Sequence, residues 1–121
     1  MRFPCLTEHD EQVALCRVLD AYRITYCAIP NAGKRSFRTA AKLKAEGLQP
    51  GFPDLLILDV PAGSSIRGCA VEMKRSKGGK LAPAQSAWLD KLHALGWAVI
   101  VAKGSSDALV QLGALGYGRR Q

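Results

Sequence analysis

The sequence lacks the segments that place a protein in or across a membrane. It has no apolar run near the roughly 18 residues that a membrane-spanning helix needs. Its N-terminal residues Met1-Arg2-Phe3-Pro4 do not lead into the apolar stretch of a signal peptide. These absences argue against a membrane partner and against export, so we expect a cytoplasmic protein.

Zinc-binding and cofactor-binding patterns are also missing. The cysteines are not spaced as zinc ligands, and both histidines are expected to be surface residues. We expect three of the four cysteines, which have apolar neighbours, to be reduced core residues. Residues 31–35 lack the full pattern of a phosphate-binding loop, so an ordinary turn is favoured there. The sequence therefore predicts neither a zinc site nor a small organic cofactor.

Nothing in the sequence divides the chain into separate domains. It has 121 residues, 48% of them hydrophobic, with no repeat, low-complexity segment or long linker. That length and composition suit one domain with one buried core. We therefore expect a single domain over residues 1–121.

Negative charge is scarce in this chain. Ten Asp and Glu residues face 17 Lys and Arg residues, which gives a formal net charge of +7. The basic residues form two clusters, Lys34, Arg35, Arg38, Lys42 and Lys44, and then Lys74, Arg75, Lys77 and Lys80. Such an excess favours a polyanionic partner such as nucleic acid, although many basic domains owe their charge to solubility alone.

The pattern of apolar residues and turns predicts an α/β fold. Thr7 is a candidate cap for a first helix, Pro83 suits the first turn of a later one, and glycines end several elements. We expect helices over about 7–21, 39–46, 83–95 and 106–112, and strands over about 24–29, 54–59, 67–74 and 97–102. This order indicates a mixed β-sheet flanked by α-helices.

Three charged residues interrupt two predicted strands that are otherwise apolar. Asp54 begins one strand, and Glu72 and Lys74 lie at the end of the next. Residues two apart in a strand point to the same face, so Glu72 and Lys74 should emerge side by side, and a hairpin could bring Asp54 next to them. Carboxylates grouped in apolar surroundings are costly to desolvate. A bound divalent cation and a phosphate would offset that cost.

With these residues placed, the chain resembles the VRR-NUC domain family of the PD-(D/E)xK nuclease superfamily. The resemblance extends from Glu8 to about Leu112, and Ala82 stands where the family often has serine. It is carried by ordered segments with the family's spacing, Gly51-Phe52-Pro53-Asp54-Leu55, Val71-Glu72-Met73-Lys74-Arg75 and Gly79-Lys80-Leu81-Ala82-Pro83-Ala84-Gln85, with Trp88 one turn further on. The resemblance implies a restriction-endonuclease-like core.

The resemblance also implies roles for the matching residues. Asp54, Glu72 and the backbone carbonyl of Met73 would ligate a catalytic Mg²⁺ or Mn²⁺ ion. Lys74 would position the attacking water and offset charge on the phosphorane. Histidine and cysteine are not required, because Mg²⁺ prefers oxygen ligands.

Two further residues are assigned by the same resemblance. Glu8, four residues before Gln12, would bind or orient the metal directly or through water, although Asp10 and Glu11 are neighbouring acids. Gln85 would contact the site or the DNA backbone. The residues that we expect to contact phosphates are Lys34, Arg35, Arg38, Arg75, Lys77 and Lys80.

Together, the roles implied by the resemblance predict a metal-dependent, structure-specific DNA endonuclease. Small stand-alone members of the family, typically from phages and bacteria, are similar to Holliday-junction resolvases that act as homodimers. We therefore expect a homodimer that cleaves branched DNA in a bacterial or phage-infected host cell. One alternative is a nickase of flap, single-stranded or mismatched DNA. Another is a DNA-binding module without catalysis, which the site acids disfavour because they would repel phosphate.

Each feature taken alone also has a simpler explanation. Asp54 after Pro53 could be turn chemistry, and Glu72 with Lys74 could be a surface pair. The acids of the first helical turn could serve the helix dipole. Trp88 and Trp97 are expected in the core, rather than as platforms for bases. The ordered combination of motifs favours the nuclease over these separate explanations.

Overall fold

The computed structural model describes residues 6–30 and 37–118, without the side chains of Phe37 and Arg38. The helices and strands follow in the expected order. They are α1 (Glu8–Ala21), β1 (Tyr26–Ala28), α2 (Phe37–Ala45), β2 (Leu55–Ile57), β3 (Cys69–Lys74), α3 (Pro83–Ala94), β4 (Ala98–Lys103) and α4 (Ser105–Leu115).

Strands β1 and β2 are shorter than the sequence predicts. Their paired ladder covers three residues of each strand. The backbone pairing nevertheless continues past the ladder, because Ile29 N–H donates to the Asp54 carbonyl and Leu58 N–H to the Thr25 carbonyl. Pro30 and Pro53 flank the Ile29–Asp54 end of this pairing, and neither has an N–H with which to extend the ladder there. The prediction was therefore wrong only in the strand limits.

The described residues form a four-stranded mixed sheet in the order β1-β2-β3-β4. The pairs β1–β2 and β2–β3 are antiparallel, whereas β3 and β4 are parallel. Parallel neighbours need a crossover connection, and α3 supplies it between β3 and β4. The predicted α/β fold with a mixed sheet flanked by helices is confirmed.

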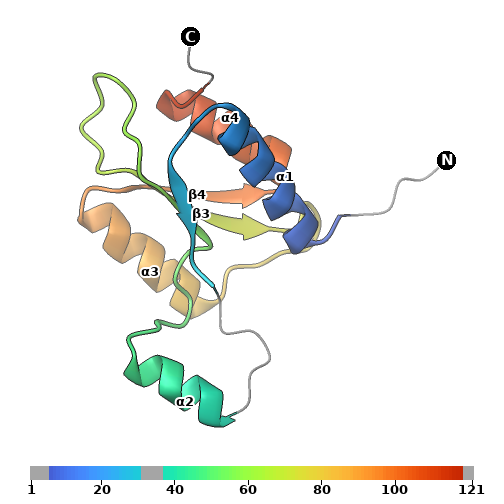
Figure 1. Cartoon of the computed structure of the whole chain (residues 1–121), viewed down its shortest axis with the longest axis vertical. Coiled ribbons are helices and arrows are strands. Elements are labelled where there is room, and N and C mark those ends of the chain that lie inside the picture. The colour runs from blue at the N-terminus through green and yellow to red at the C-terminus, as the bar shows by residue number, and fades with distance from the viewer. Residues whose placement is uncertain (1–5, 31–36, 119–121) are drawn as a thin grey trace, which may run out of the picture.

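The hydrophobic core lies between the sheet and the helices α1 and α4. Leu15 and Leu19 of α1 and Leu112 of α4 pack in one cluster with Val71 and Met73 of β3. Figure 1 shows α1 and α4 together on one side of β3 and β4, with α3 on the other side. Val71 and Met73 thus point to the α1–α4 side, and the alternate residues of β3 point towards α3.

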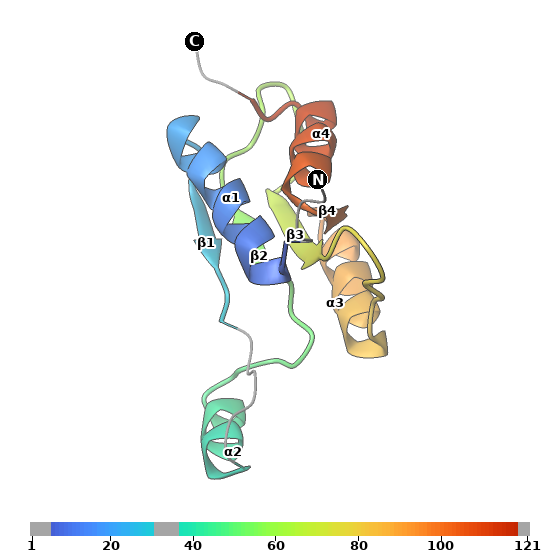
Figure 2. The same cartoon turned by 90° about the vertical axis from the view of Figure 1, so that its right-hand side faces the viewer.

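Helix α2 stands apart from the rest of the described chain in both views (Figures 1 and 2). Residues 39–47 are exposed except for Leu43, which is half-buried. In the chain, α2 lies between the paired strands β1 and β2. None of the helices in the described ranges is long and apolar enough to cross a membrane.

One expectation about the core is wrong. Trp88 and Trp97 are half-buried and lie outside the buried cluster. Among the described cysteines, Cys69 is buried, Cys16 is half-buried and Cys27 is exposed on an edge strand, all with free thiols.

Candidate active site

The antiparallel pairing of β2 and β3 brings the three predicted site residues together. Leu55 pairs with Val71, so continuing the register by one residue sets Asp54 opposite Glu72. Lys74 follows on the same face of β3, two residues further along. Asp54, Glu72 and Lys74 line one cavity of about 290 Å³ with residues from α1, β3 and α3, namely Glu8, His9, Gln12, Met73 and Gln85.

Glu72 is the most unusual group in this cavity. It is 1% exposed, and among the described residues neither of its carboxylate oxygens has a hydrogen-bond partner. Burial, and secondly the neighbouring Asp54 carboxylate, raise the pKa of Glu72 to about 8, although the charge of Lys74 acts in the opposite direction. A buried carboxylate with no partner destabilises a fold unless something else binds it.

Asp54 is held in place by backbone groups. Its Oδ2 atom accepts a hydrogen bond from the Met73 N–H at 2.7 Å. The preceding loop is held against the first turn of α3, because a Cβ atom on Gly51 would come within 2.8 Å of the Ala84 Cβ. Gly51 also has a φ of +84°, which side chains disfavour. The motif glycine therefore sets the distance between Asp54 and the helix that carries Gln85.

Lys74 is oriented by Gln85. The Lys74 Nζ atom donates to the Gln85 Oε1 atom at 2.9 Å, and the same oxygen accepts the Ala82 N–H at 2.8 Å. Lys74 is 9% exposed, and Gly79 packs against it so closely that an added Cβ would lie 2.9 Å from the Lys74 Cβ. Gln85 thus fixes the ammonium group and the start of α3 with one carbonyl oxygen.

Replacing Gln85 with alanine is expected to slow DNA cleavage about 10- to 100-fold, because a displaced ammonium group loses its alignment with the reacting phosphate. The affinity for DNA should change little. Single-turnover cleavage and equilibrium binding by the same variant check this, and Ser86→Ala is the matched control on the next residue of α3. Unchanged cleavage by Gln85→Ala would show that Lys74 needs no such acceptor.

The three acids at the start of α1 have different surroundings. Thr7 and Asp10 form a capping box, with the Asp10 N–H donating to Thr7 Oγ1 at 3.1 Å. Glu11 is 7% exposed, and its Oε1 atom accepts bonds from the N–H and the hydroxyl of Ser105, which begins α4. Glu8 lines the cavity, so it is the acid of this turn that faces Glu72 and Asp54.

The described residues contain no group of three His, Cys, Asp or Glu side chains close enough to hold one ion. Glu8 therefore shares the cavity with Asp54 and Glu72 without completing a three-carboxylate cluster. Met73 also lines the cavity, next to the Asp54 carboxylate that its N–H binds.

The predicted DNA-contacting residues are only partly described. Lys34 and Arg35 lie outside the described residues, and Arg38 belongs to α2 without a described side chain. Arg75, Lys77 and Lys80 are exposed on the loop between Lys74 and α3. This loop puts positive charge next to the cavity.

His9 is a cavity residue that the sequence analysis set aside as a surface histidine. It is exposed, and it lines both the site cavity and a neighbouring groove of about 380 Å³ along α1. His9 and Gln12 are three residues apart and hence share a face of the helix. That spacing on the helix that also carries Glu8 was the available signal.

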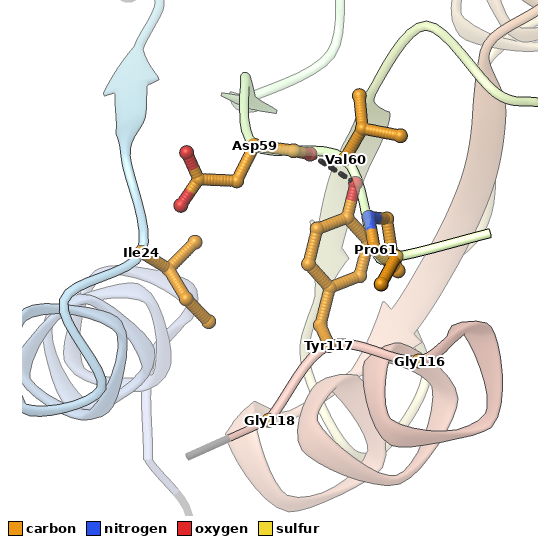
Figure 3. A pocket seen from close by; sticks show the side chains of 8 residues that line it. Ile24, Asp59, Val60, Pro61, Gly116, Tyr117 and Gly118 are labelled. Carbon is orange, nitrogen blue, oxygen red and sulfur yellow. Dashed lines mark hydrogen bonds between the residues drawn. The ribbon is translucent and has the colours of Figure 1, made fainter. Parts of the chain in front are cut away.

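A second cavity lies at the far end of β2. It has a volume of about 360 Å³, and Asp59 is the one charged residue among its described lining residues. Figure 3 shows Tyr117 reaching across to the Asp59 backbone, where its hydroxyl donates to the carbonyl oxygen at 2.6 Å. The Asp59 carboxylate accepts the Thr25 N–H. These polar groups form hydrogen bonds between distant segments of the chain, and they do not resemble a catalytic site.

Comparisons with known proteins agree with the geometry. A solved structure described as a VRR_NUC domain protein has a TM-score of 0.75 and 23% sequence identity, with 93% of this chain and 89% of that chain covered. At that identity the likeness shows a shared fold. No curated protein matches the chain. A model of the VRR-NUC domain family matches residues 5–106. The chain therefore belongs to the VRR-NUC family of nuclease domains.

Proposed function

We propose that this nuclease domain is a divalent-metal-dependent endonuclease that cleaves branched DNA, with four-way junctions as its principal substrate, and that it acts as a homodimer. The observation that carries the metal dependence is the buried Glu72 carboxylate without a hydrogen-bond partner, beside Asp54 and Lys74. The junction preference and the dimer are supported by the resemblance to small stand-alone family members.

The residues of the cavity fit a hard divalent cation. Asp54 and Glu72 supply carboxylate oxygens, which Mg²⁺ and Mn²⁺ prefer, and the Met73 carbonyl is a candidate third ligand. An ion there would satisfy Glu72 and remove the penalty for its burial. Glu8 on the opposite wall would orient water at the edge of the site. Such an ion would polarise the scissile phosphate and lower the pKa of a bound water.

The chain's own groups supply the remaining functions. Lys74, fixed by Gln85, presents a positive charge that stabilises the negative charge developing on the phosphate. Asp54 is anchored by the Met73 N–H and therefore stays in place when substrate binds. Arg75, Lys77 and Lys80 lie outside the cavity and are suited to phosphates on either side of the cut. Contacts of this kind position DNA without reading its sequence.

The proposal is tested by comparing four-way, flap and linear DNA of matched sequence and concentration, with Mg²⁺, with Mn²⁺ and with EDTA. We expect cleavage with either metal, none with EDTA, and the fastest cleavage on the four-way junction. Binding should weaken steeply with salt, by about 10³-fold or more between 50 and 200 mM if six or more phosphates are contacted.

Cleavage in EDTA would contradict the metal dependence. Equal rates on linear and branched DNA would contradict the structural preference. The dimer is checked separately by light scattering on the purified protein, where a monomer at all concentrations, with and without junction DNA, would remove it from the proposal.

A further inference from the structure

We propose that an apolar depression formed by Phe52 and Trp88 receives an unpaired nucleobase of the DNA substrate next to the cut. The proposal rests on the proposed function in taking DNA as the ligand, and it adds a site that selects substrates with unpaired bases at a branch. It also changes the interpretation of Trp88, which the sequence analysis expected in the core.

The depression has the shape and chemistry of a stacking site. Its volume is about 260 Å³, and its walls are mainly apolar, with Ile29, Leu48, Phe52 and Trp88 among them. The rings of Phe52 and Trp88 meet edge to face, with centroids 5.0 Å apart and planes at 66°. Both side chains are half-buried, so apolar ring surface remains open to solvent. Aromatic rings of this kind stack on unpaired bases of any sequence.

The depression is joined by short covalent links to the catalytic residues. Phe52 is two residues before Asp54, in the loop that Gly51 holds against Ala84. Trp88 is one turn after Gln85 on α3, and Gln85 binds the Lys74 ammonium group. A base stacked between these elements would therefore be fixed relative to the carboxylates and to Lys74.

Positive charge borders the depression where phosphates of the bound strand would pass. The Lys91 Nζ atom lies over one face of the Trp88 ring, 4.9 Å from its centre, so a base would stack on the other face. Residues Gly47 and Leu48 of the depression are separated from α2 by the exposed Glu46, and the last turn of α2 carries the exposed Lys42 and Lys44. This combination of aromatic surface and flanking lysines matches a single nucleic-acid strand, with its apolar bases and charged backbone, better than it matches another apolar protein face.

The chain contains two tryptophans, Trp88 and Trp97, which makes the site directly observable. In the variant Trp97→Phe, all tryptophan fluorescence comes from Trp88, and Trp88→Phe provides the matched control that reports Trp97. Both are combined with Lys74→Ala, so that DNA is bound in Mg²⁺ without being cut. The probes are a flap with unpaired bases and a fully paired duplex of the same sequence.

We expect the flap to quench Trp88 fluorescence strongly and the paired duplex to leave it nearly unchanged. Trp97 fluorescence should change little with either of them. In the same Lys74→Ala background, with Trp97 and Phe52 unchanged, Trp88→Ala should weaken flap binding about 5- to 150-fold, the range expected for one stacked base, and should leave duplex binding unchanged. Phe52→Leu, which keeps an apolar side chain, is a second test should Trp88→Ala fail to fold.

Several results would overturn the inference while leaving the nuclease in place. One is cleavage with normal metal dependence, equal binding of flap and duplex, and no quenching of Trp88. Another is Trp88→Ala converting a dimer into a monomer with unchanged flap affinity, which would make the depression an interface between copies. Failure to bind or cut any DNA would instead contradict the proposed function itself.

Discussion

Lys74→Ala is expected to reduce DNA cleavage by about 10³-fold while keeping full affinity for Mn²⁺, whereas Asp54→Asn should lose both. Lys74 supplies a positive charge and is not a metal ligand, so removing it leaves the carboxylate oxygens in place. The amide oxygen introduced by Asp54→Asn can still accept the Met73 N–H and hence keep the fold, but it presents no charged oxygen to a cation. Single-turnover cleavage and calorimetric titration with Mn²⁺ separate the two effects.

The matched control is Lys103→Ala. Lys103 pairs with Lys74 across the parallel strands β3 and β4, carries the same charge, is exposed, and is not among the cavity residues. Its removal should leave both cleavage and Mn²⁺ affinity nearly unchanged. Wild-type turnover by Lys74→Ala would remove the lysine from the mechanism. Unchanged Mn²⁺ affinity in Asp54→Asn would contradict its assignment as a ligand.

The parts of the site that follow from strand geometry could be predicted from sequence. The alternation of side chains along β3 places Glu72 and Lys74 on one face, and the antiparallel pairing of β2 with β3 adds Asp54. Thr7 was recognisable as a helix cap because its capping box involves residues three apart. These are local relationships, and neither requires knowledge of how distant elements pack.

Contacts between distant elements could not be predicted in the same way. The acids Glu8, Asp10 and Glu11 occupy one helical turn. Asp10 forms the local capping box, but the different roles of Glu8 and Glu11 depend on Ser105 of α4, which donates to Glu11. Gln85 was matched to the site by resemblance, but its bond to Lys74 depends on where α3 packs. The half-buried position of Trp88 likewise depends on how α3 packs against distant segments, which apolar spacing along α3 does not reveal.

The site also makes a prediction about stability, since a buried carboxylate without a hydrogen-bond partner, such as that of Glu72, weakens a fold. Without metal, the protein should become less stable as pH rises from about 5 to about 8, and Glu72→Gln should remove most of that loss. The pKa of Glu72 is about 8 in the folded protein, against 4.5 as its ordinary value. Between these values the folded state holds a proton that the unfolded state has released, so raising the pH favours unfolding.

The expected loss of unfolding free energy is several kcal/mol at most, because each unit of pKa difference between the folded and unfolded states is worth about 1.4 kcal/mol. For a chain of this size, each kcal/mol of that loss should lower the Tm by about 4 °C. Burial raises the pKa of Cys69 and of Tyr117 to about 12, so neither thiol nor phenol titrates in this range. Thermal unfolding of wild type and Glu72→Gln in EDTA at pH 5, 6, 7 and 8 measures the difference directly.

Adding Mg²⁺ or Mn²⁺ at pH 8 should restore stability to the wild type much more than to Glu72→Gln, because a ligand that binds only the folded state stabilises it. The variant should meanwhile have lost cleavage, so one substitution would raise the stability of the metal-free protein and abolish its activity. Such opposite effects on stability and activity are expected of a carboxylate that binds a ligand and does not stabilise the fold. If the stability of the two proteins in EDTA depended equally on pH, burial would not raise the pKa of Glu72 in the folded protein. The main support for a metal at this site would then be lost.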